Sequence, residues 1–389
     1  MKSESLEINL FCLGDSADIN TWSNLPYFFS KALIKRGVKI NRINIFPYEE
    51  PGYNAYMHFL ETWFLIQKRL FGINRVYDFF RDRVSCYFAN KRIEREVTRF
   101  PNADFNIFLT FSLSSGRYSS TPVINVCDIA YEHYLEESGK KKGKRELRFI
   151  ETEKQNLQMA DIVCGLSEKC RQFLRTRYRL NNVLKLTPGI NLGVEEPNDV
   201  EQLLSCKWGS KNIAFVGRGV QKRGIDILLE AFGLFNKEHG DRFTLHIVGA
   251  SRAELATSSK NVKCHGYLSK GNPEDLSLYL EILRSATVFV MPMREGPFPG
   301  VIREALLHYT PVIMSNIWNE EQKIEHDYNG ILVDRIEPTA FAEEMGSLLR
   351  DRQKWENIAR NAHESVEQFS WERSVEELLE RAMNRTALP

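Results

Sequence analysis

The sequence predicts an α/β protein made of two doubly wound, Rossmann-like domains. Short apolar runs, about four to eight residues long, alternate with longer segments of helical spacing. This alternation stops at a polar stretch near the middle of the chain and then starts again. The length of 389 residues is sufficient for roughly two to three domains.

The bulk composition is that of an ordinary globular chain. With 43% hydrophobic residues and a net charge of +1, nothing in the totals points to a nucleic-acid partner. The seven cysteines form no C-x-x-C pair, which argues against a disulfide framework or zinc cluster and fits a reducing cytoplasm. The N-terminus is too acidic for a signal peptide, and no apolar run approaches the roughly 18 residues that cross a bilayer. We expect a cytoplasmic protein, and peripheral contact with the inner face of the membrane stays open.

The first half begins as strand, loop, helix and strand. Residues 6–13 form an apolar run that ends at Gly14, a helix is expected over 27–37, and a second strand over 38–46. Ligands of a doubly wound sheet bind at the carboxyl ends of its strands. The loop after Gly14 is therefore a candidate ligand edge, and an ordinary polar loop is an equal alternative.

The remaining elements follow the same alternation. In the first half, strands are expected at 105–111, 123–126, 162–165 and 183–186, with helices at 153–161 and at 168–178, the latter capped by Ser167. In the second half, strands are expected at 212–216, 243–248, 262–265, 286–291, 311–314 and 330–333, with helices at 225–238, 276–285, 338–350, 355–369 and 370–382. The polar stretch 191–210 marks the boundary. We expect an acceptor-binding domain over 1–195, a donor-binding domain over 196–370, and a helix in 371–389 that returns to the first domain.

Two segments of the first half allow two interpretations. Residues 53–80 are rich in aromatic side chains at mostly helical spacing, which favours core packing over an acceptor groove or a membrane-facing surface. The basic run 140–145 (KKKGKR) favours a solvated helix start, and contact with acidic headgroups or an anionic lipid-linked acceptor is the alternative.

The stretch 293–313, MREGPFPGVIREALLHYTPVI, carries the clearest chemistry. Glu295 and Glu304 frame a Gly/Pro turn that opens a helix. The unpaired N–H groups of a helix start attract phosphate, and carboxylates accept hydrogen bonds from sugar hydroxyls. A phosphate seat flanked by hydroxyl acceptors predicts a nucleotide-sugar site.

A second loop offers cations. Arg218, Lys222 and Arg223 lie between one strand and the next helix, so they approach the two-acid turn if the two strands are close in the sheet. Two cations and a helix start can neutralise a diphosphate without metal, and the absence of an Asp-x-Asp sequence agrees with that. A solvated helix start is the alternative. NAD binding is unlikely because Lys222 replaces the third glycine of G-x-G-x-x-G.

The ordered motifs resemble the retaining family 4 glycosyltransferases, which have the GT-B fold of two Rossmann-like domains facing across a cleft. In the second half they are FVGR at 215–218, the bases before Gly224, IVG at 247–249, HGY at 265–267, Pro292 with Glu295 to Glu304, PVI at 311–313 and NG at 329–330. In the first half they are TWS at 21–23, AD at 160–161, SE at 167–168 and TPGIN at 187–191.

The resemblance implies a role for individual residues. Arg218, with Lys222 or Arg223, would hold the diphosphate, Glu304 would hold the ribose hydroxyls, and Glu295 would touch the donor sugar as a catalytic candidate. Tyr267 would lie beside the base through its main chain, and the Gly14 loop would close over the donor. The nucleotide-sugar-binding set is completed by Gly217, Gly296, Phe298, Pro299, Gly300 and Val301.

Two departures from the family pattern are visible. Eight residues separate Glu295 from Glu304 where the family has seven, and alignment on Phe298 puts the first acid at Gly296. Cys127 stands where the family often has a histidine, leaving Asp128 as a candidate for contact with the sugar or acceptor, or as a simple loop or helix cap. His133 could replace the histidine, although a lone histidine is more often structural.

The resemblance implies a retaining hexosyltransferase that needs no metal or other cofactor. The expected donor is a nucleotide sugar, UDP-linked before others, and the expected acceptor is a saccharide or a lipid-linked saccharide in polysaccharide or glycolipid synthesis. A non-catalytic GT-B protein that binds sugar or acts as a scaffold is the alternative. A phosphorylase of similar fold would need a lysine-bound pyridoxal phosphate.

Overall fold

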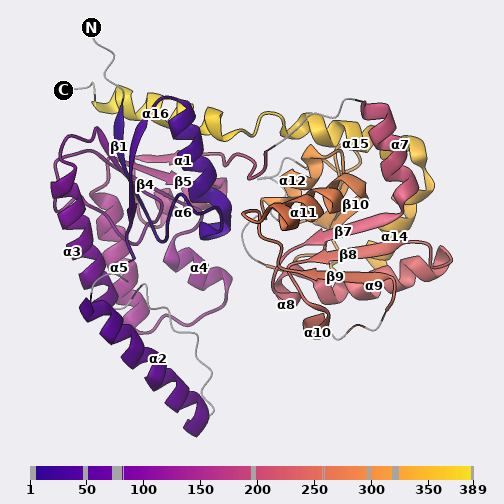
Figure 1. Cartoon of the computed structure of the whole chain (residues 1–389), viewed down its shortest axis with the longest axis horizontal. Coiled ribbons are helices and arrows are strands. Elements are labelled where there is room, and N and C mark those ends of the chain that lie inside the picture. The colour runs from indigo at the N-terminus through magenta and orange to yellow at the C-terminus, as the bar shows by residue number, and fades with distance from the viewer. Residues whose placement is uncertain are drawn as a thin grey trace. The chain divides into compact units, whose positions relative to one another are not determined.

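The computed structural model describes residues 6–46, 51–71, 81, 83–193, 199–255, 257, 259–295, 299–317 and 324–386. The chain forms two compact units (Figure 1): unit 1 is Met1–Pro188 with Trp371–Pro389, and unit 2 is Gly189–Ser370. Each unit has a six-stranded parallel sheet, which confirms the predicted α/β fold of two doubly wound domains. None of the helices in the described ranges has the length and apolar composition needed to traverse a membrane.

The sheet of unit 1 reverses its winding between β1 and β3. Its strands are β1 (Glu7–Cys12), β2 (Lys39–Asn44), β3 (Phe105–Phe108), β4 (Val123–Cys127), β5 (Ile162–Gly165) and β6 (Val183–Lys185), in the order β2-β1-β3-β4-β5-β6. The chain pairs β1 first with β2 on one side and then with β3 on the other. Ligands of such sheets bind outside the carboxyl ends of the strands where the winding reverses.

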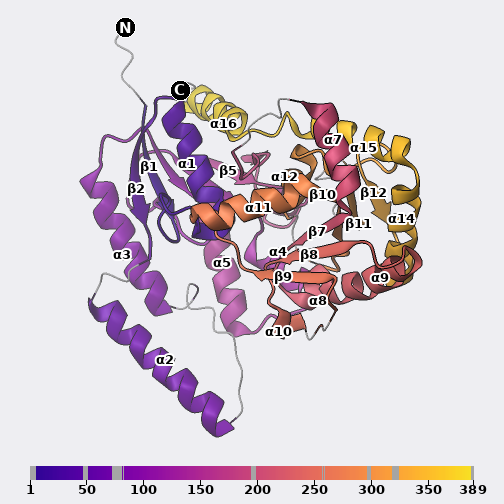
Figure 2. The ribbon, with the colours of Figure 1, turned by 45° about the vertical axis from the view of Figure 1, so that its right-hand side comes forward.

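Helices cover both faces of this sheet. One face carries α1 (Leu25–Lys35), preceded by the short 3₁₀ helix η1 (Thr21–Asn24), and α16 (Trp371–Thr386). The other carries α3 (Arg83–Arg99), α4 (Tyr131–Glu137), α5 (Lys144–Gln158) and α6 (Glu168–Thr176). Helices α1 and α16 lie side by side in both views (Figures 1 and 2), with the rings of Phe29 and Trp371 perpendicular at 5.9 Å. Ser167 caps α6, as predicted, by accepting from the Cys170 N–H at 3.0 Å.

Helix α2 (Pro51–Phe71) differs from the expected core helix. Tyr53, Met57 and Leu60 are buried beside Phe88 of α3, but Phe59 is 65% and Trp63 47% exposed. The prediction that the aromatic segment packs in the core is therefore wrong for these two residues, because a helical spacing of apolar residues does not distinguish a core face from an exposed one. The side chains of Phe64 and Phe71, and all of residues 72–80, lie outside the described residues.

The sheet of unit 2 reverses its winding between β7 and β10. Its strands are β7 (Asn212–Val216), β8 (Thr244–Val248), β9 (Val262–Gly266), β10 (Ala286–Met291), β11 (Val312–Ser315) and β12 (Ile331–Val333), in the order β12-β11-β10-β7-β8-β9. The helices are α7 (Val200–Ser210), α8 (Val220–Arg223), α9 (Ile225–Glu238), α10 (Arg252–Leu255), α11 (Pro273–Ser285), α12 (Val301–Leu307), α14 (Pro338–Arg350) and α15 (Arg352–Val366). The two strands that precede the predicted cation loop and two-acid turn are therefore neighbours.

Helix α7 occupies the segment that the sequence presents as a polar boundary. Its Lys207 is fully buried and donates to Leu283 O at 2.8 Å, Arg284 O at 2.9 Å and Thr310 Oγ1 at 2.9 Å. Burial lowers the pKa of this lysine well below its usual range. The three acceptors satisfy its three donors, so a residue that is polar in the sequence belongs to the core and helps to attach α7 to unit 2.

Candidate functional site

Two loops meet at the carboxyl ends of β7 and β10. The main-chain oxygen of Lys222 accepts from the N–H groups of Arg294 at 2.9 Å and Glu295 at 3.4 Å. The Lys222 ammonium also lies 3.4 Å from Glu295 Oε1. The structure thus brings the predicted cation loop against the first predicted acid, at the edge where a doubly wound sheet binds ligands.

Gly224 makes this close approach of the loops feasible. Its φ is +70°, and a Cβ at this position would lie 1.8 Å from the main-chain oxygen of Pro292. A side chain would therefore meet both a left-handed backbone and the loop after β10. The basic residues before Gly224 owe their position to this contact.

The three predicted cations differ in their surroundings. Arg218 is exposed, and its guanidinium carbon lies 5.5 Å from the ring centre of Tyr267, which is 57% exposed. Lys222 is exposed beside Glu295. Arg223 is partly buried, and burial lowers the pKa of its guanidinium. Arg218 and Lys222 are thus both exposed in the same loop, where a charged group can reach them.

Sequence reasoning missed the ion pair that fixes this loop. Arg294 donates to both carboxylate oxygens of Asp226 at 2.8 Å and to Gln221 O at 2.8 Å. These hydrogen bonds lower the pKa of Asp226. The pairing joins two segments 68 residues apart, and no local spacing in the sequence indicates it.

The turn before α12 is only partly described. Gly296 and Phe298 lie outside the described residues, as does Pro297, so the placement of the first acid at Gly296 stays a prediction. Gly300 precedes the helix, which begins at Val301, and Pro299 O accepts from Ile302 N at 3.1 Å. Helix α12 has seven residues, and the contact of its first N–H groups with phosphate stays a prediction.

Glu304 is buried and held at both of its oxygens. It is 2% exposed, and its Oε1 accepts from Lys270 Nζ at 2.6 Å while Oε2 accepts from Tyr279 Oη at 2.6 Å. Lys270 also donates to Asn191 O at 2.8 Å. Burial and the neighbouring carboxylate raise the pKa of Tyr279 far above its usual range, so it stays a neutral donor. Both Glu304 oxygens are therefore engaged within unit 2, and the contact of Glu304 with ribose hydroxyls stays a prediction. Neither Lys270 nor Tyr279 stands out in the sequence.

The loop after β1 of unit 1 has unusual backbone conformations. Gly14 has φ +106°, and a Cβ there would lie 2.9 Å from Thr21 Cγ2. Trp22, Ser23 and Asn24 have φ of 35°, 54° and 69°, three consecutive left-handed residues that are not glycine. Such strained backbone occurs preferentially at ligand sites. Its position at the β1/β3 reversal favours a ligand edge over an ordinary loop.

Asp128 follows β4 directly and is partly exposed. The Cys127 thiol donates to its Oδ1 at 3.3 Å, and burial raises the pKa of the carboxyl group above its usual value. A carboxylate with a raised pKa at a strand end is typical of a functional position. Two interpretations of Asp128 therefore stay open: contact with the sugar or acceptor, or a cap in the loop before α4. Structural contacts also hold α4 itself.

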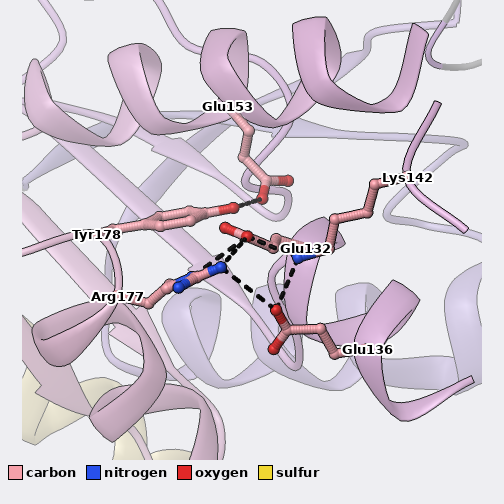
Figure 3. Close-up of polar contacts among 6 residues, drawn as sticks. All are labelled: Glu132, Glu136, Lys142, Glu153, Arg177 and Tyr178. Atoms are coloured by element: carbon pink, nitrogen blue, oxygen red, sulfur yellow. Dashed lines mark hydrogen bonds and ion pairs between the residues drawn. The ribbon is translucent and has the colours of Figure 1, made fainter. Parts of the chain in front are cut away.

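Those contacts form a network at α4 (Figure 3). Lys142 Nζ lies 2.7 Å from Oε1 of both Glu132 and Glu136, and Arg177 Nη2 lies 2.9 Å from Glu132 Oε1. The hydrogen bonds from Lys142 and Arg177 outweigh burial and lower the pKa of Glu132. The network joins α4, the basic run and the end of α6, and so fixes the helix that follows Asp128.

His133 and the basic run are engaged within unit 1. The ring of His133 stacks on Phe173 at 4.6 Å, and its Nε2 lies 3.4 Å from Glu137 Oε1. Lys140 donates to Tyr134 Oη at 2.7 Å, and α5 begins at Lys144. These contacts favour a structural role for the histidine and a helix start for the run.

Glu153 gives this region a pH-dependent stability. It is 1% exposed and accepts at Oε1 from Tyr131 N at 2.9 Å and Tyr178 Oη at 3.2 Å, the latter drawn in Figure 3. Burial raises its pKa from 4.5 to about 7. The folded chain therefore holds this proton more tightly than the unfolded chain, and the free energy of unfolding falls as the pH rises from 4.5 to about 7.

We expect Glu153→Gln to remove the loss of stability that accompanies ionisation of Glu153. Its amide oxygen can still accept both hydrogen bonds, so the free energy of unfolding should rise by at most about 3 kcal/mol at pH 8 and by about 1 kcal/mol or less at pH 5. Urea denaturation at the two pH values measures the difference, with the exposed Glu151→Gln as control. An equal gain at both pH values would show that shape, not titration, is responsible.

Comparisons with known proteins agree on one class. Residues 210–351 match the family model described as glycosyl transferases group 1. The D-inositol 3-phosphate glycosyltransferase of Corynebacterium urealyticum is 26% identical over 219 residues, covering 54% of this chain and 50% of the relative. An uncharacterized glycosyltransferase of Methanocaldococcus jannaschii is 29% identical over 196 residues, covering 48% of each. The matched part thus spans about half the length of these curated relatives.

Solved structures match over nearly the whole chain. Sucrose-phosphate synthase from Thermosynechococcus elongatus has a TM-score of 0.69 at 17% identity and covers 99% of this chain and 100% of its own. Anabaena HepE in complex with UDP and glucose has a TM-score of 0.64 at 16% identity, covering 97% and 100%. WaaG, a glycosyltransferase of lipopolysaccharide biosynthesis, has a TM-score of 0.66 at 13% identity, covering 97% and 100%. At these identities the likeness establishes the fold.

Proposed function

Because this chain belongs to the family 4 glycosyltransferases with the GT-B fold, we propose that it moves a hexosyl group from a nucleotide-diphosphate sugar to a saccharide or lipid-linked acceptor. The observation that carries the proposal is the meeting of the Arg218–Arg223 loop with Glu295 at the β7/β10 reversal. The UDP and glucose bound by the structurally similar HepE support a UDP-linked donor.

In this proposal each part of the site has one task. Arg218 and Lys222, assisted by Arg223, hold the diphosphate and stabilise the charge that develops as its bond to the anomeric carbon breaks. Glu304 accepts from the ribose hydroxyls, and Glu295 contacts the donor sugar. The acceptor hydroxyl attacks on the face that the leaving group departs from, and its proton passes to the diphosphate, so configuration is retained. We assign the acceptor to unit 1, where Asp128 follows β4 directly.

The proposed reaction requires no metal, and we place it in the cytoplasm or at the inner face of the membrane. Purified protein, incubated with a panel of nucleotide sugars and acceptors, should release UDP at a rate that EDTA leaves unchanged. Loss of release on EDTA treatment would contradict metal independence alone. Failure of every nucleotide to bind by calorimetry would overturn the donor site.

A non-catalytic role has one observation in its favour. Glu295 is one residue further from Glu304 than the family pattern requires, and its carboxylate is occupied by Lys222 at 3.4 Å. Tight nucleotide binding without turnover across many acceptors would support a sugar-binding scaffold. Turnover that is lost in Glu304→Ala would exclude it.

A further inference from the structure

One face of α2 is an exposed apolar stripe. Phe59, Trp63, Ile66 and Leu70 are 65%, 47%, 40% and 68% exposed. They are four, three and four residues apart, which places them on a single side of the helix. We call these four side chains the α2 stripe.

The part of α2 that carries most of this stripe is exposed along its described length. Tyr53, Met57 and Leu60 attach the first half of the helix to α3. From residue 61 to residue 70, every described side chain is exposed. In both views α2 extends beyond the sheet and the helices that cover it (Figures 1 and 2). An exposed apolar surface of this kind is typical of a site that binds another protein or a membrane.

The side of α2 away from the stripe is mostly polar. Asn54, His58 and Glu61 are exposed and, at 100° per residue, lie more than about 100° from the stripe. The exposed Leu65 (68%) lies on this side too. From Phe59 to Leu70 the helix is about 16 Å long. An aromatic and aliphatic face opposed by a polar face is the pattern of a helix that lies in a lipid interface with its apolar side immersed.

The net charge of the region around α2 indicates which kind of membrane surface it would bind. Residues 51–99 contain nine Lys or Arg and five Asp or Glu, a net charge of +4, whereas the whole chain has +1. The remainder of the chain is therefore net negative. Within this region α2 itself carries Glu61, Lys68 and Arg69, a net charge of +1, and basic charge on an amphipathic helix complements the anionic lipids of a membrane surface.

The size of the stripe argues against a second copy of the chain as its partner. Its four side chains expose on the order of 400 Å², about half of the roughly 800 Å² that each partner contributes to a standard protein interface. A lipid surface needs no such complementary area, because each apolar group partitions independently.

We propose that the α2 stripe docks this protein on an anionic lipid surface, with α2 lying in the plane of the headgroups. The proposal assigns the contact to α2 rather than to the basic run 140–145, of which Lys140 and Lys142 hydrogen-bond within unit 1. It concerns lipid binding alone and is tested without the transfer reaction.

The test uses the full chain and sedimentation with phosphatidylcholine vesicles that contain either no phosphatidylglycerol or about one third of it. The wild type should sediment with the anionic vesicles and much less with the neutral ones. Trp63→Glu and Leu70→Glu should each lower the bound fraction at least tenfold. Trp63 should also shift its fluorescence to shorter wavelength on binding, and Trp63→Phe should remove that shift.

Matched variants distinguish lipid docking by the α2 stripe from lipid binding by the basic run and from dimerisation. Leu234→Glu changes a leucine that is 43% exposed on α9 and should bind as the wild type does. Circular dichroism and thermal melting should be unchanged in all variants, since the replaced side chains are exposed. Binding that survives in Leu70→Glu but is lost in Lys141→Glu/Lys144→Glu would overturn the proposal, as would a wild-type dimer by light scattering that Trp63→Glu dissociates.

Discussion

Arg218→Ala is expected to lower kcat/KM for the nucleotide sugar by about 10²- to 10³-fold, the usual cost of removing one group that stabilises developing charge. Arg218 is exposed at the end of β7, with its guanidinium carbon 5.5 Å from the Tyr267 ring centre. In the proposed site, its removal leaves Lys222 and the partly buried Arg223 to hold the diphosphate. Steady-state kinetics of UDP release measure the effect.

The division of that loss between kcat and KM distinguishes two roles. A fall in kcat means that Arg218 acts on the charge that forms as the donor bond breaks, whereas a rise in KM alone means that it holds donor and transition state equally. Arg218→Lys should recover part of the loss because it keeps a point charge. Arg360→Ala, on α15 in the same unit, removes an ion pair with Glu201 and should leave kinetics unchanged. Activity near the wild-type level in Arg218→Ala would remove this residue from the proposed site.

Lys270→Met is expected to lower the free energy of unfolding by about 3–5 kcal/mol, the range measured when one partner of a buried ion pair is removed. The substitution leaves the Glu304 carboxylate, which is 2% exposed, with the Tyr279 hydroxyl as its one remaining partner in the Lys270–Glu304–Tyr279 group. It also removes the hydrogen bond to Asn191 O. Urea denaturation followed by circular dichroism measures the change.

Two further variants make this prediction specific. Lys35→Met breaks an ion pair with Glu372 in which the side chains are 71% and 48% exposed, so it should cost less than about 1 kcal/mol. Glu304→Gln in the Lys270→Met background removes the stranded charge and should restore most of the stability, as a double-mutant cycle would show. Equal costs for Lys270→Met and Lys35→Met would mean that the buried pair is not a stabilising unit.

Much of the fold follows from local patterns in the sequence. The runs 212–216 and 286–291 coincide with β7 and β10, because a strand buried on both faces is apolar along its length. The sequence left open whether these two strands are neighbours, and the structure shows that they are, which brings Lys222 to Glu295. The cation loop and the two acids could be predicted from the sequence because each directly follows a strand that is recognisable as an apolar run.

The contacts that hold the site were not accessible in the same way. Lys270 and Glu304 are 34 residues apart, and Arg294 and Asp226 are 68 apart. Each pair depends on how loops from different strands pack, which no periodicity records. The exposure of α2 was missed for a related reason, since an apolar helix face has one pattern whether a core or another surface covers it.

The membership of α16 in unit 1 affects the order in which the chain is completed. Unit 2 is one continuous segment, whereas unit 1 joins Met1–Pro188 to Trp371–Pro389. During synthesis from the N-terminus, unit 2 has all of its residues before unit 1 does. Until Trp371 and the helix it begins are made, the apolar face of α1 around Phe29 lacks its cover. The domain that starts first therefore finishes last, and its exposed face during that interval is where misassembly would begin.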